Sequence, residues 1–150
     1  MSEEEAYAKP LGSPADKLVF VVDDDPLIRD LLDITLKDAG FKTAFAVNGH
    51  DAAGKLETLE PHLIITDLMM PGQGGYEFLR SLQGSAGGRL PIIVITASQL
   101  DASTVRMIKQ EANVVEFVNK PIKMALLIGA LHKHLNTAPL PTTSRGLNDR

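Results

Sequence analysis

Four short apolar runs constrain the fold of this chain, because each of them ends at or next to a polar side chain. The runs cover residues 18–22, 63–66, 92–95 and 114–118, and the polar residues that follow them are Asp23 and Asp24, Asp67, Thr96 and Lys120. Continuous β-branched runs of this length are typical of strands buried on both faces of a parallel sheet. Ligands bind beyond the carboxyl ends of such strands. These five side chains are therefore predicted to converge on one site.

Helical patterns separate the strands. Helices are expected at about 26–39, 48–59, 76–83, 101–111 and 122–135, with a further short strand at 43–47. Pro26 suits a first helical turn, Asp25 suits the N-cap, and Gly40 suits the C-terminal stop. Right-handed crossovers then give an α/β fold, a doubly wound sheet with helices on both faces.

Both ends of the chain are predicted to be extensions of one domain. Residues 1–17 carry prolines and a glycine among polar residues, and residues 137–150 are similar. We expect a flexible N-terminal extension, a folded domain over 18–136 and a flexible C-terminal tail. A chain of 150 residues is long enough for one such domain with a real core.

Composition excludes several classes of protein. The chain has no cysteine, so it forms no disulfide and no thiolate-ligated metal site. No apolar stretch approaches the roughly 20 residues that span a bilayer, and the acidic N-terminus lacks a signal-peptide pattern. We therefore expect a cytoplasmic protein without membrane contact. The net charge of -4 argues against a general affinity for nucleic acid.

Asp23, Asp24 and Asp67 form a predicted cluster of carboxylates. Clustered carboxylates resist full ionisation, and a hard cation relieves their repulsion. Mg²⁺ is typically held by one or two carboxylates together with phosphate oxygens. The cluster therefore predicts a Mg²⁺ site with room for phosphate. Taken alone, the first two aspartates could instead serve only as the acidic start of a helix.

Asp67 is the candidate nucleophile, because a carboxylate that attacks phosphorus forms an acyl phosphate. The hydroxyl of Thr96 could donate to a phosphoryl oxygen, and the ammonium of Lys120 is a compact positive charge suited to phosphate. Each residue also has an ordinary structural explanation on its own. Asp67 could cap the turn after its strand, Thr96 could reflect β-propensity, and Lys120 could be a solvated surface lysine. Their joint placement at strand ends favours the functional interpretation.

Four motifs in the same order resemble the receiver domain of two-component response regulators. They are Val21–Arg29 with its three aspartates, Asp67–Gly75 with the pattern Asp-x-x-Met-Pro-x-x-x-Gly, Thr96–Ala97, and Phe117–Pro121. The likeness runs from about residue 18 to 135. It implies a flavodoxin-like sheet of five parallel strands in the order 2-1-3-4-5, with five flanking helices.

The resemblance implies a role for each matching residue. Asp67 matches the phosphoacceptor, Asp24 the acid that contacts Mg²⁺ directly, and Asp23 its partner, which usually acts through water. Met69 matches the position whose backbone carbonyl completes the metal site. Thr96 and Lys120 match the residues that bind phosphoryl oxygens.

The resemblance also implies a signalling mechanism. A sensor histidine kinase or a histidine phosphotransfer protein would donate the phosphoryl group, and residues 101–135 would then change how the chain binds a downstream protein. Phe117 matches the aromatic switch of this surface, and the Lys120–Pro121 bond is expected to be cis. Such a chain catalyses only its own phosphorylation and hydrolysis, so it is not an ordinary enzyme. We expect a stand-alone regulator, as a monomer or a weak phosphorylation-dependent dimer.

Two departures from the family pattern stand out. Glu111–Ala112 replaces a common Gly-Ala pair, with about two extra residues before Phe117. This difference leaves the start of the last strand and the shape of the output face open. Met69 and Ser98 occupy the positions that flank the hydrolytic water in the family. Neither side chain readily orients that water, so we expect slow self-dephosphorylation.

Two other functions are weighed against this one. A degenerate receiver would act only as a docking module and would not bind Mg²⁺. An aspartyl-phosphate phosphatase would carry a second aspartate two residues after its nucleophile, where this chain has Met69. Leu127, Leu131 and Leu135 could extend an apolar stripe outward for dimerisation, but we favour core packing.

Overall fold

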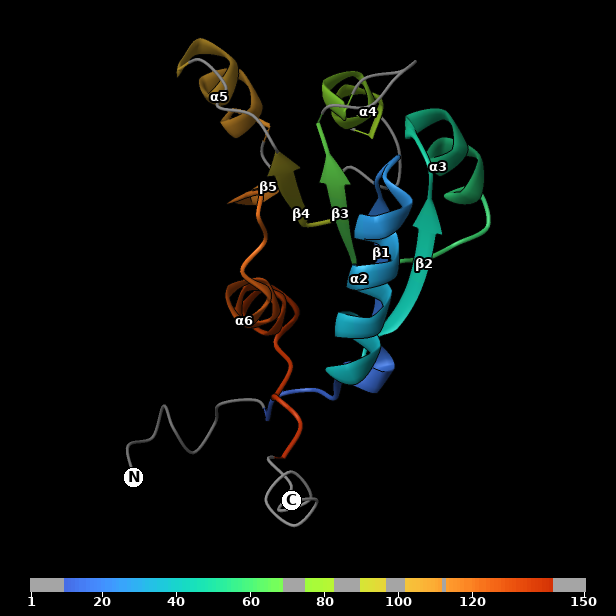
Figure 1. The fold of residues 1–150 in the computed structure, drawn as a ribbon, viewed down its shortest axis with the longest axis vertical. Helices are drawn as coiled ribbons and strands as arrows, with labels where there is room; N and C mark the ends of the chain where they lie inside the picture. Colours follow the sequence, from blue (N-terminus) through green and yellow to red (C-terminus); the bar gives the residue numbers. More distant parts are fainter. Residues whose placement is uncertain (1–9, 69–74, 83–89, 97–101, 112, 142–150) are drawn as a thin grey trace.

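Five parallel strands form a single sheet in the order β2-β1-β3-β4-β5 (Figure 1). The computed structural model describes residues 10–68, 75–82, 90–96, 102–111 and 113–141. The strands are β1 (Leu18–Val22), β2 (Lys42–Ala46), β3 (Leu63–Asp67), β4 (Ile92–Thr96) and β5 (Val114–Asn119). The predicted doubly wound sheet and its strand order are confirmed.

The helices cover both faces of the sheet. They are the 3-10 helix η1 (Pro14–Asp16) and the α-helices α2 (Pro26–Asp38), α3 (Gly49–Lys55), α4 (Gly75–Leu82), α5 (Ala102–Lys109) and α6 (Met124–Leu135). As predicted, the Asp25 carboxylate caps α2 by accepting the Leu27 N–H at 2.9 Å. Gly40 follows the end of this helix with a φ of +99°.

Two predicted boundaries differ from the structure for local reasons. The helix expected to reach Leu59 ends at Lys55, because the Glu57 and Thr58 N–H groups make tighter turns to carbonyls three residues back, for Thr58 to the Lys55 carbonyl at 3.2 Å. The strand expected at 43–47 lies one residue earlier, and the Val47 N–H instead donates to the Asp51 carboxylate. The other boundaries lie within two residues of prediction.

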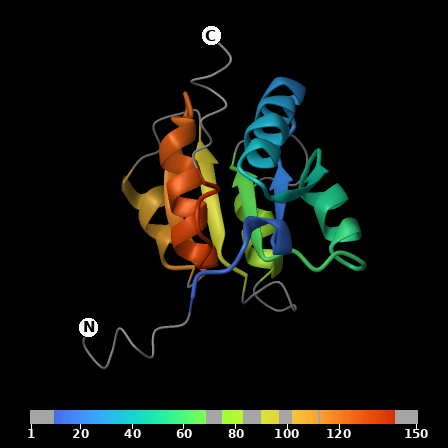
Figure 2. The same cartoon turned by 90° about the horizontal axis from the view of Figure 1, so that it is seen from below.

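Two layers of apolar side chains fill the space between the sheet and the helices. α2 and α6 cover one face of the sheet, and α3, α4 and α5 cover the other (Figure 2). Leu127, Leu131 and Leu135 are buried in the layer beneath α6, so the core-packing interpretation is confirmed. All residues of β3 and β4 are buried, which explains why their sequences are continuous apolar runs.

A β-bulge interrupts the pairing of β5 with β4. Ile92 pairs with Val114 and Ile93 with Glu116, so Val115 is left without a pairing partner. The bulge absorbs one of the extra residues that precede Phe117 in the sequence. It also settles the start of the last strand, which begins at Val114 as predicted.

Segments from the two ends of the chain meet near the amino ends of the strands. The Gly12 N–H donates to the Asn136 carbonyl at 2.8 Å, and the Ala138 N–H donates to the Gly12 carbonyl at 3.0 Å. We call this contact, between residues 10–17 and 136–141, the terminal bridge.

Within the described residues, none of the helices has the length and apolar character needed to cross a membrane.

Candidate functional site

Three carboxylates meet at the carboxyl ends of β1 and β3. One oxygen each from Asp23, Asp24 and Asp67 can be chosen so that all three lie within 4.8 Å of one another. Asp67 is the last residue of β3, and Asp23 follows β1, where its N–H donates to the Ala46 carbonyl at 3.1 Å. Asp23 and Asp67 are buried, whereas Asp24 is exposed. The predicted carboxylate cluster is therefore present.

Lys120 reaches this cluster from the end of β5. Its Nζ atom lies 3.1 Å from Asp67 Oδ2 and 3.4 Å from Asp23 Oδ2. The Lys120 N–H donates to the Thr96 carbonyl at 2.9 Å, which fixes the backbone beside β4. Burial alone would lower the pKa of Lys120, but its hydrogen bond to Asp67 and the charge of Asp23 outweigh burial and raise that pKa. The Lys120–Pro121 bond is cis, as predicted.

Asp23 is the most deeply buried carboxylate of the cluster. Its Oδ1 accepts the Asp25 N–H at 2.9 Å, but among the described residues its buried Oδ2 has no hydrogen-bond partner. The contact of Oδ2 with Lys120 Nζ is an ion pair that lacks hydrogen-bond geometry. Burial, and next the charge of Asp67, raise the pKa of Asp23 against the opposing effects of Asp25 and Lys120. A buried carboxylate oxygen without a donor is a natural cation ligand.

Arg29 is a site residue that the sequence argument did not identify. Its Nη1 donates to the Asp23 carbonyl at 2.7 Å, which ties the loop after β1 to the first turns of α2. The available signal was its position near the start of a helix that immediately follows the acidic residues. A side chain there can point back toward the loop.

Thr96 and Phe117 lie where the sequence places them. Thr96 is buried at the end of β4 and pairs in register with Asn119 of β5. Phe117 is partly buried against the apolar layer under α3, α4 and α5. Lys109 Nζ of α5 lies 5.8 Å from the centroid of its ring, a cation–π distance. The predicted site residue Met69 lies outside the described residues, as does Ser98.

The donor set defines what this end of the sheet can bind. Three carboxylates suit a hard divalent cation, whereas the ammonium of Lys120 suits an anion that reaches Asp67. Both groups would lie beside the buried end of β4, where Thr96 is found. The residues present therefore fit a cation and an anionic group held side by side.

Comparison with known proteins gives one consistent family. The family model of the response regulator receiver domain matches residues 19–132. The DNA-binding response regulator MtrA of Mycolicibacterium smegmatis is 33% identical over 117 residues, which are 78% of this chain and 50% of that protein. The MtrA protein of Mycobacterium tuberculosis (strain ATCC 25618 / H37Rv) is 32% identical with the same coverage. This chain thus spans about half the length of the curated relatives it matches.

Solved structures agree with the family match. A response regulator receiver protein from Pseudomonas putida superposes with a TM-score of 0.74 at 29% identity, covering 84% of this chain and 98% of that one. The chemotaxis protein CheY4 of Vibrio cholerae superposes with a TM-score of 0.72 at 27% identity, covering 79% and 98%. The family match, the shared fold and the assembled motif residues lead to one conclusion: this chain belongs to the receiver domains of two-component response regulators.

Proposed function

We propose that this receiver domain is a switch in which Asp67 accepts a phosphoryl group from a phosphohistidine. The observation that carries the proposal is the contact of Lys120 Nζ with Asp67 Oδ2, beside the Asp23 Oδ2 atom, which accepts no hydrogen bond from the described residues. An Asp67 oxygen would attack phosphorus, a P–O bond would form, and the P–N bond to the imidazole would break. The imidazole would leave with the electron pair and take up a proton.

Asp23, Asp24 and Asp67 would hold Mg²⁺ during this step, together with the Met69 carbonyl that the family resemblance implies. The cation would neutralise charge that develops on the phosphoryl oxygens. The chain's own residues set the geometry: Arg29 fixes the Asp23 backbone, and Lys120 holds the Asp67 carboxylate.

Phosphorylation would redistribute the contacts of Lys120 and Thr96. Lys120 bridges two carboxylates in this structure, and new phosphoryl oxygens would compete for its ammonium. Thr96 would move toward the phosphoryl group, and Phe117 would turn inward. The outcome is a population shift of the surface formed by residues 101–135, which would alter binding of a downstream protein.

The exposed face of α2 supports an interaction with a phosphodonor protein. Leu27, Leu31 and Ile34 have exposed fractions of 76%, 46% and 68%, and their spacing places them along one side of the helix. This stripe begins directly after the acidic loop that holds Asp23 and Asp24. A histidine kinase or a phosphotransfer protein that packs on it would bring its phosphohistidine close to Asp67.

Receiver domains are signalling domains and not ordinary enzymes. For this one we propose slow self-dephosphorylation, because Met69 and Ser98 offer no side chain that readily orients water. We also propose a domain over 18–136 with extensions at 1–17 and 137–150, of which residues 10–17 and 137–141 pack against the domain in the terminal bridge. A phosphoryl half-life of seconds on the purified protein would contradict slow self-dephosphorylation.

Intact mass after incubation with acetyl phosphate and Mg²⁺ tests the proposed function. We expect one added phosphoryl group on the wild type, none on Asp67→Asn, and none on the wild type in excess chelator. A folded wild type that gains no mass from acetyl phosphate or from a phosphorylated phosphotransfer protein would favour the docking-module alternative.

A further inference from the structure

The two edge strands of the sheet differ in whether side chains form hydrogen bonds with their outward-facing backbone groups. In β2, the backbone groups of Lys42 and Ala46 form hydrogen bonds on the β1 side of the strand. Because backbone groups alternate in direction along a strand of a parallel sheet, those of Phe45 and Val47 point outward. Side chains of α3 meet both outward residues. Lys55 Nζ donates to the Phe45 carbonyl at 2.7 Å, and the Asp51 carboxylate accepts the Val47 N–H at 3.0 Å. The β2 edge is therefore partly capped by side chains, a device that discourages pairing with another strand.

The β5 edge has no such caps in the described part of the chain. The Lys120 N–H donates to the Thr96 carbonyl on the β4 side, so the same alternation turns the N–H and carbonyl groups of Phe117 and Asn119 outward. No side chain among the described residues donates to or accepts from these outward groups. As far as the described residues go, the β5 edge is thus open for pairing.

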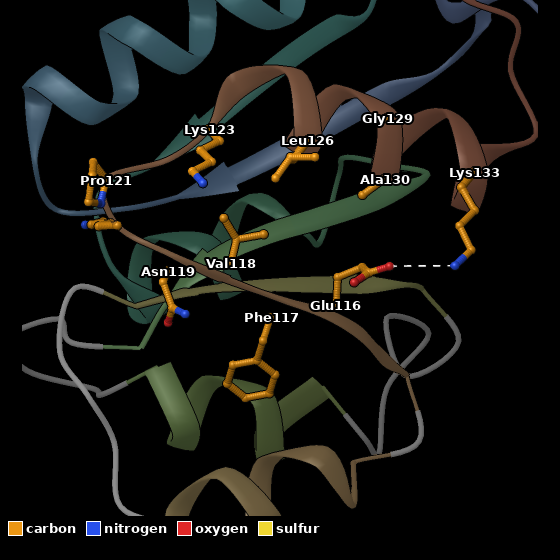
Figure 3. A pocket seen from close by; sticks show the side chains of 11 residues that line it. Glu116, Phe117, Val118, Asn119, Pro121, Lys123, Leu126, Gly129, Ala130 and Lys133 are labelled. Carbon is orange, nitrogen blue, oxygen red and sulfur yellow. Dashed lines mark ion pairs between the residues drawn. The ribbon is translucent and has the colours of Figure 1, made fainter.

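A groove of 660 Å³ runs along this open edge, between β5 and α6 (Figure 3). Lys123 and Lys133 line it against the single acid Glu116, and Lys120 also lines it but pairs its ammonium with Asp67 and Asp23. Glu116 is itself engaged by His134 Nε2 at 3.1 Å and points toward Lys133 in Figure 3. The groove therefore carries an excess of positive charge.

The opposite face of β5 carries a second hollow. It has a volume of 470 Å³ and is lined by Lys109, Phe117 and neighbouring residues of β5. Figure 3 shows Phe117 and Val118 pointing to opposite sides of the strand. A strand added to β5 would alternate its side chains in the same way, so successive residues would enter the two hollows in turn. Both hollows offer lysines to that strand.

Gly129 gives independent support, because packing against the described residues does not require a glycine there. A Cβ atom at this position of α6 would meet nothing within 4 Å. Glycine inside a helix is unfavourable by roughly 1 kcal/mol relative to alanine. The residue lies in the wall of the lysine-lined groove, beside the exposed Leu126. It keeps that groove wide at the cost of helix stability.

We propose that the open edge of β5 binds an extended, acidic segment of a partner protein by strand addition. Main-chain hydrogen bonds to Phe117 and Asn119 would hold the segment, acidic side chains would meet Lys123, Lys133 and Lys109, and an apolar side chain would contact Leu126. The segment would be roughly five residues long, the usual length of a strand. This proposal shares a surface with the proposed function but does not need a phosphorylated Asp67.

Amide hydrogen exchange with a model peptide tests the binding mode. The probe is an acetylated and amidated hexapeptide of alternating glutamate and valine, added to the full chain carrying Asp67→Asn so that phosphorylation plays no part. We expect exchange at the Phe117 and Asn119 N–H groups to slow at least tenfold with saturating peptide. The Val118 and Lys120 N–H groups face β4 and are already protected, so their exchange should stay slow throughout.

Two matched variants test the groove. Gly129→Gln fills it with a good helix former, and Gly54→Gln makes the same change in α3, where a Cβ also meets nothing within 4 Å. By fluorescence anisotropy we expect Gly129→Gln to weaken peptide binding at least tenfold and Gly54→Gln to leave it unchanged. Because both changes favour the helix, loss of folding does not confuse the comparison.

Several results would overturn the proposal. One is the absence of binding at millimolar peptide, and another is equal binding of a lysine–valine peptide. A third is peptide binding that leaves exchange at Phe117 and Asn119 unchanged. If those two amides are protected before peptide is added, a second copy or another segment of this chain occupies the edge. None of these results bears on phosphoryl transfer, which the mass measurement tests separately.

Discussion

The two ends of the sheet differ in how well their polar groups are satisfied. At the carboxyl ends of the strands, Asp23 is buried with one oxygen that accepts no hydrogen bond from the described part of the chain, and Lys120 is shared between two acids. At the amino ends, polar groups are paired: the Leu18 N–H donates to His62 Nδ1 at 3.0 Å, and Asn113 Nδ2 donates to the Leu90 carbonyl at 3.1 Å. The carboxyl ends of the strands are arranged to bind a ligand, and the amino ends are arranged to stabilise the fold.

This difference follows from what each end must do. A site for a cation and a phosphoryl group keeps charges close together before either group arrives, and this arrangement reduces stability. The amino end carries the terminal bridge, where His132 Nδ1 lies 2.7 Å from Thr137 Oγ1 and its ring lies 5.3 Å from that of Phe41. Burial there lowers the pKa of His132, which favours the neutral form of the ring. Each prediction below changes one end and leaves the other intact.

The largest expected effect comes from Lys120→Met. Removal of the ammonium leaves Asp23 and Asp67 buried beside each other without a counter-charge. We expect the free energy of unfolding to fall by about 3 kcal/mol, at the low end for broken buried pairs because the Lys120 side chain is 18% exposed. Urea unfolding at pH 7 measures the change. The same substitution made in Asp67→Asn should cost clearly less, and equal costs in both backgrounds would contradict this account.

At the amino end, Gly40→Ala should destabilise the fold. Gly40 has a φ of +99°, and a Cβ there would lie 3.2 Å from a methyl group of Leu140 and 3.3 Å from the side chain of Pro14. We expect a loss of about 1–2 kcal/mol from backbone strain and crowding. Gly54→Ala is the control, since it meets no neighbour and should gain up to about 1 kcal/mol. Matching effects of the two substitutions in thermal unfolding would show that the terminal bridge does not pack on Gly40.

Asp23→Asn should stabilise the fold, in contrast to most buried substitutions. The asparagine keeps an oxygen for the Asp25 N–H and removes a charge whose burial is unfavourable. We expect a gain on the order of 1 kcal/mol at pH 7, together with loss of Mg²⁺ binding.

The pH dependence of this gain follows from the raised pKa of Asp23. Because the folded protein holds that proton more tightly than the unfolded chain, the wild type carries the full cost above the folded-state pKa. The cost shrinks as the pH falls toward 3.8, the ordinary pKa of an aspartate. The stability difference between variant and wild type should therefore be larger at pH 7 than at pH 4. A difference that stays constant with pH would contradict the assigned cause.

The sequence predicts best where burial alone determines structure. β1, β3 and β4 lie in the centre of the sheet, so they are apolar except at their carboxyl ends, and their bounds are predicted within one residue. β2 and α3 depend on particular contacts, such as Asp51 with the Val47 N–H, which no hydrophobic pattern reveals. The same contacts cap the β2 edge, so the difference between the two sheet edges is visible only in the structure.

The site shows a similar division. Asp23, Asp24, Asp67, Thr96 and Lys120 could be predicted because parallel strands bring their carboxyl ends together. The role of Arg29 could not, because it depends on the angle at which α2 leaves the loop after β1. The unequal burial of the acids is also structural information: Asp23 is 1% exposed and Asp24 is exposed, although the two are neighbours in sequence.

The stability of the wild type as a function of Mg²⁺ tests the central claim most directly. The claim is that the residues at the carboxyl ends of the strands are arranged to bind a cation and a phosphoryl group, and that this arrangement lowers the stability of the fold. We predict that Mg²⁺ raises the thermal unfolding midpoint of the wild type with a saturating dependence, and that sodium chloride at the same ionic strength does not. Asp23→Asn should start higher, and both Asp23→Asn and Asp67→Asn should respond little to Mg²⁺. A wild type that does not respond to Mg²⁺, or that responds no more than the two variants, would contradict the account.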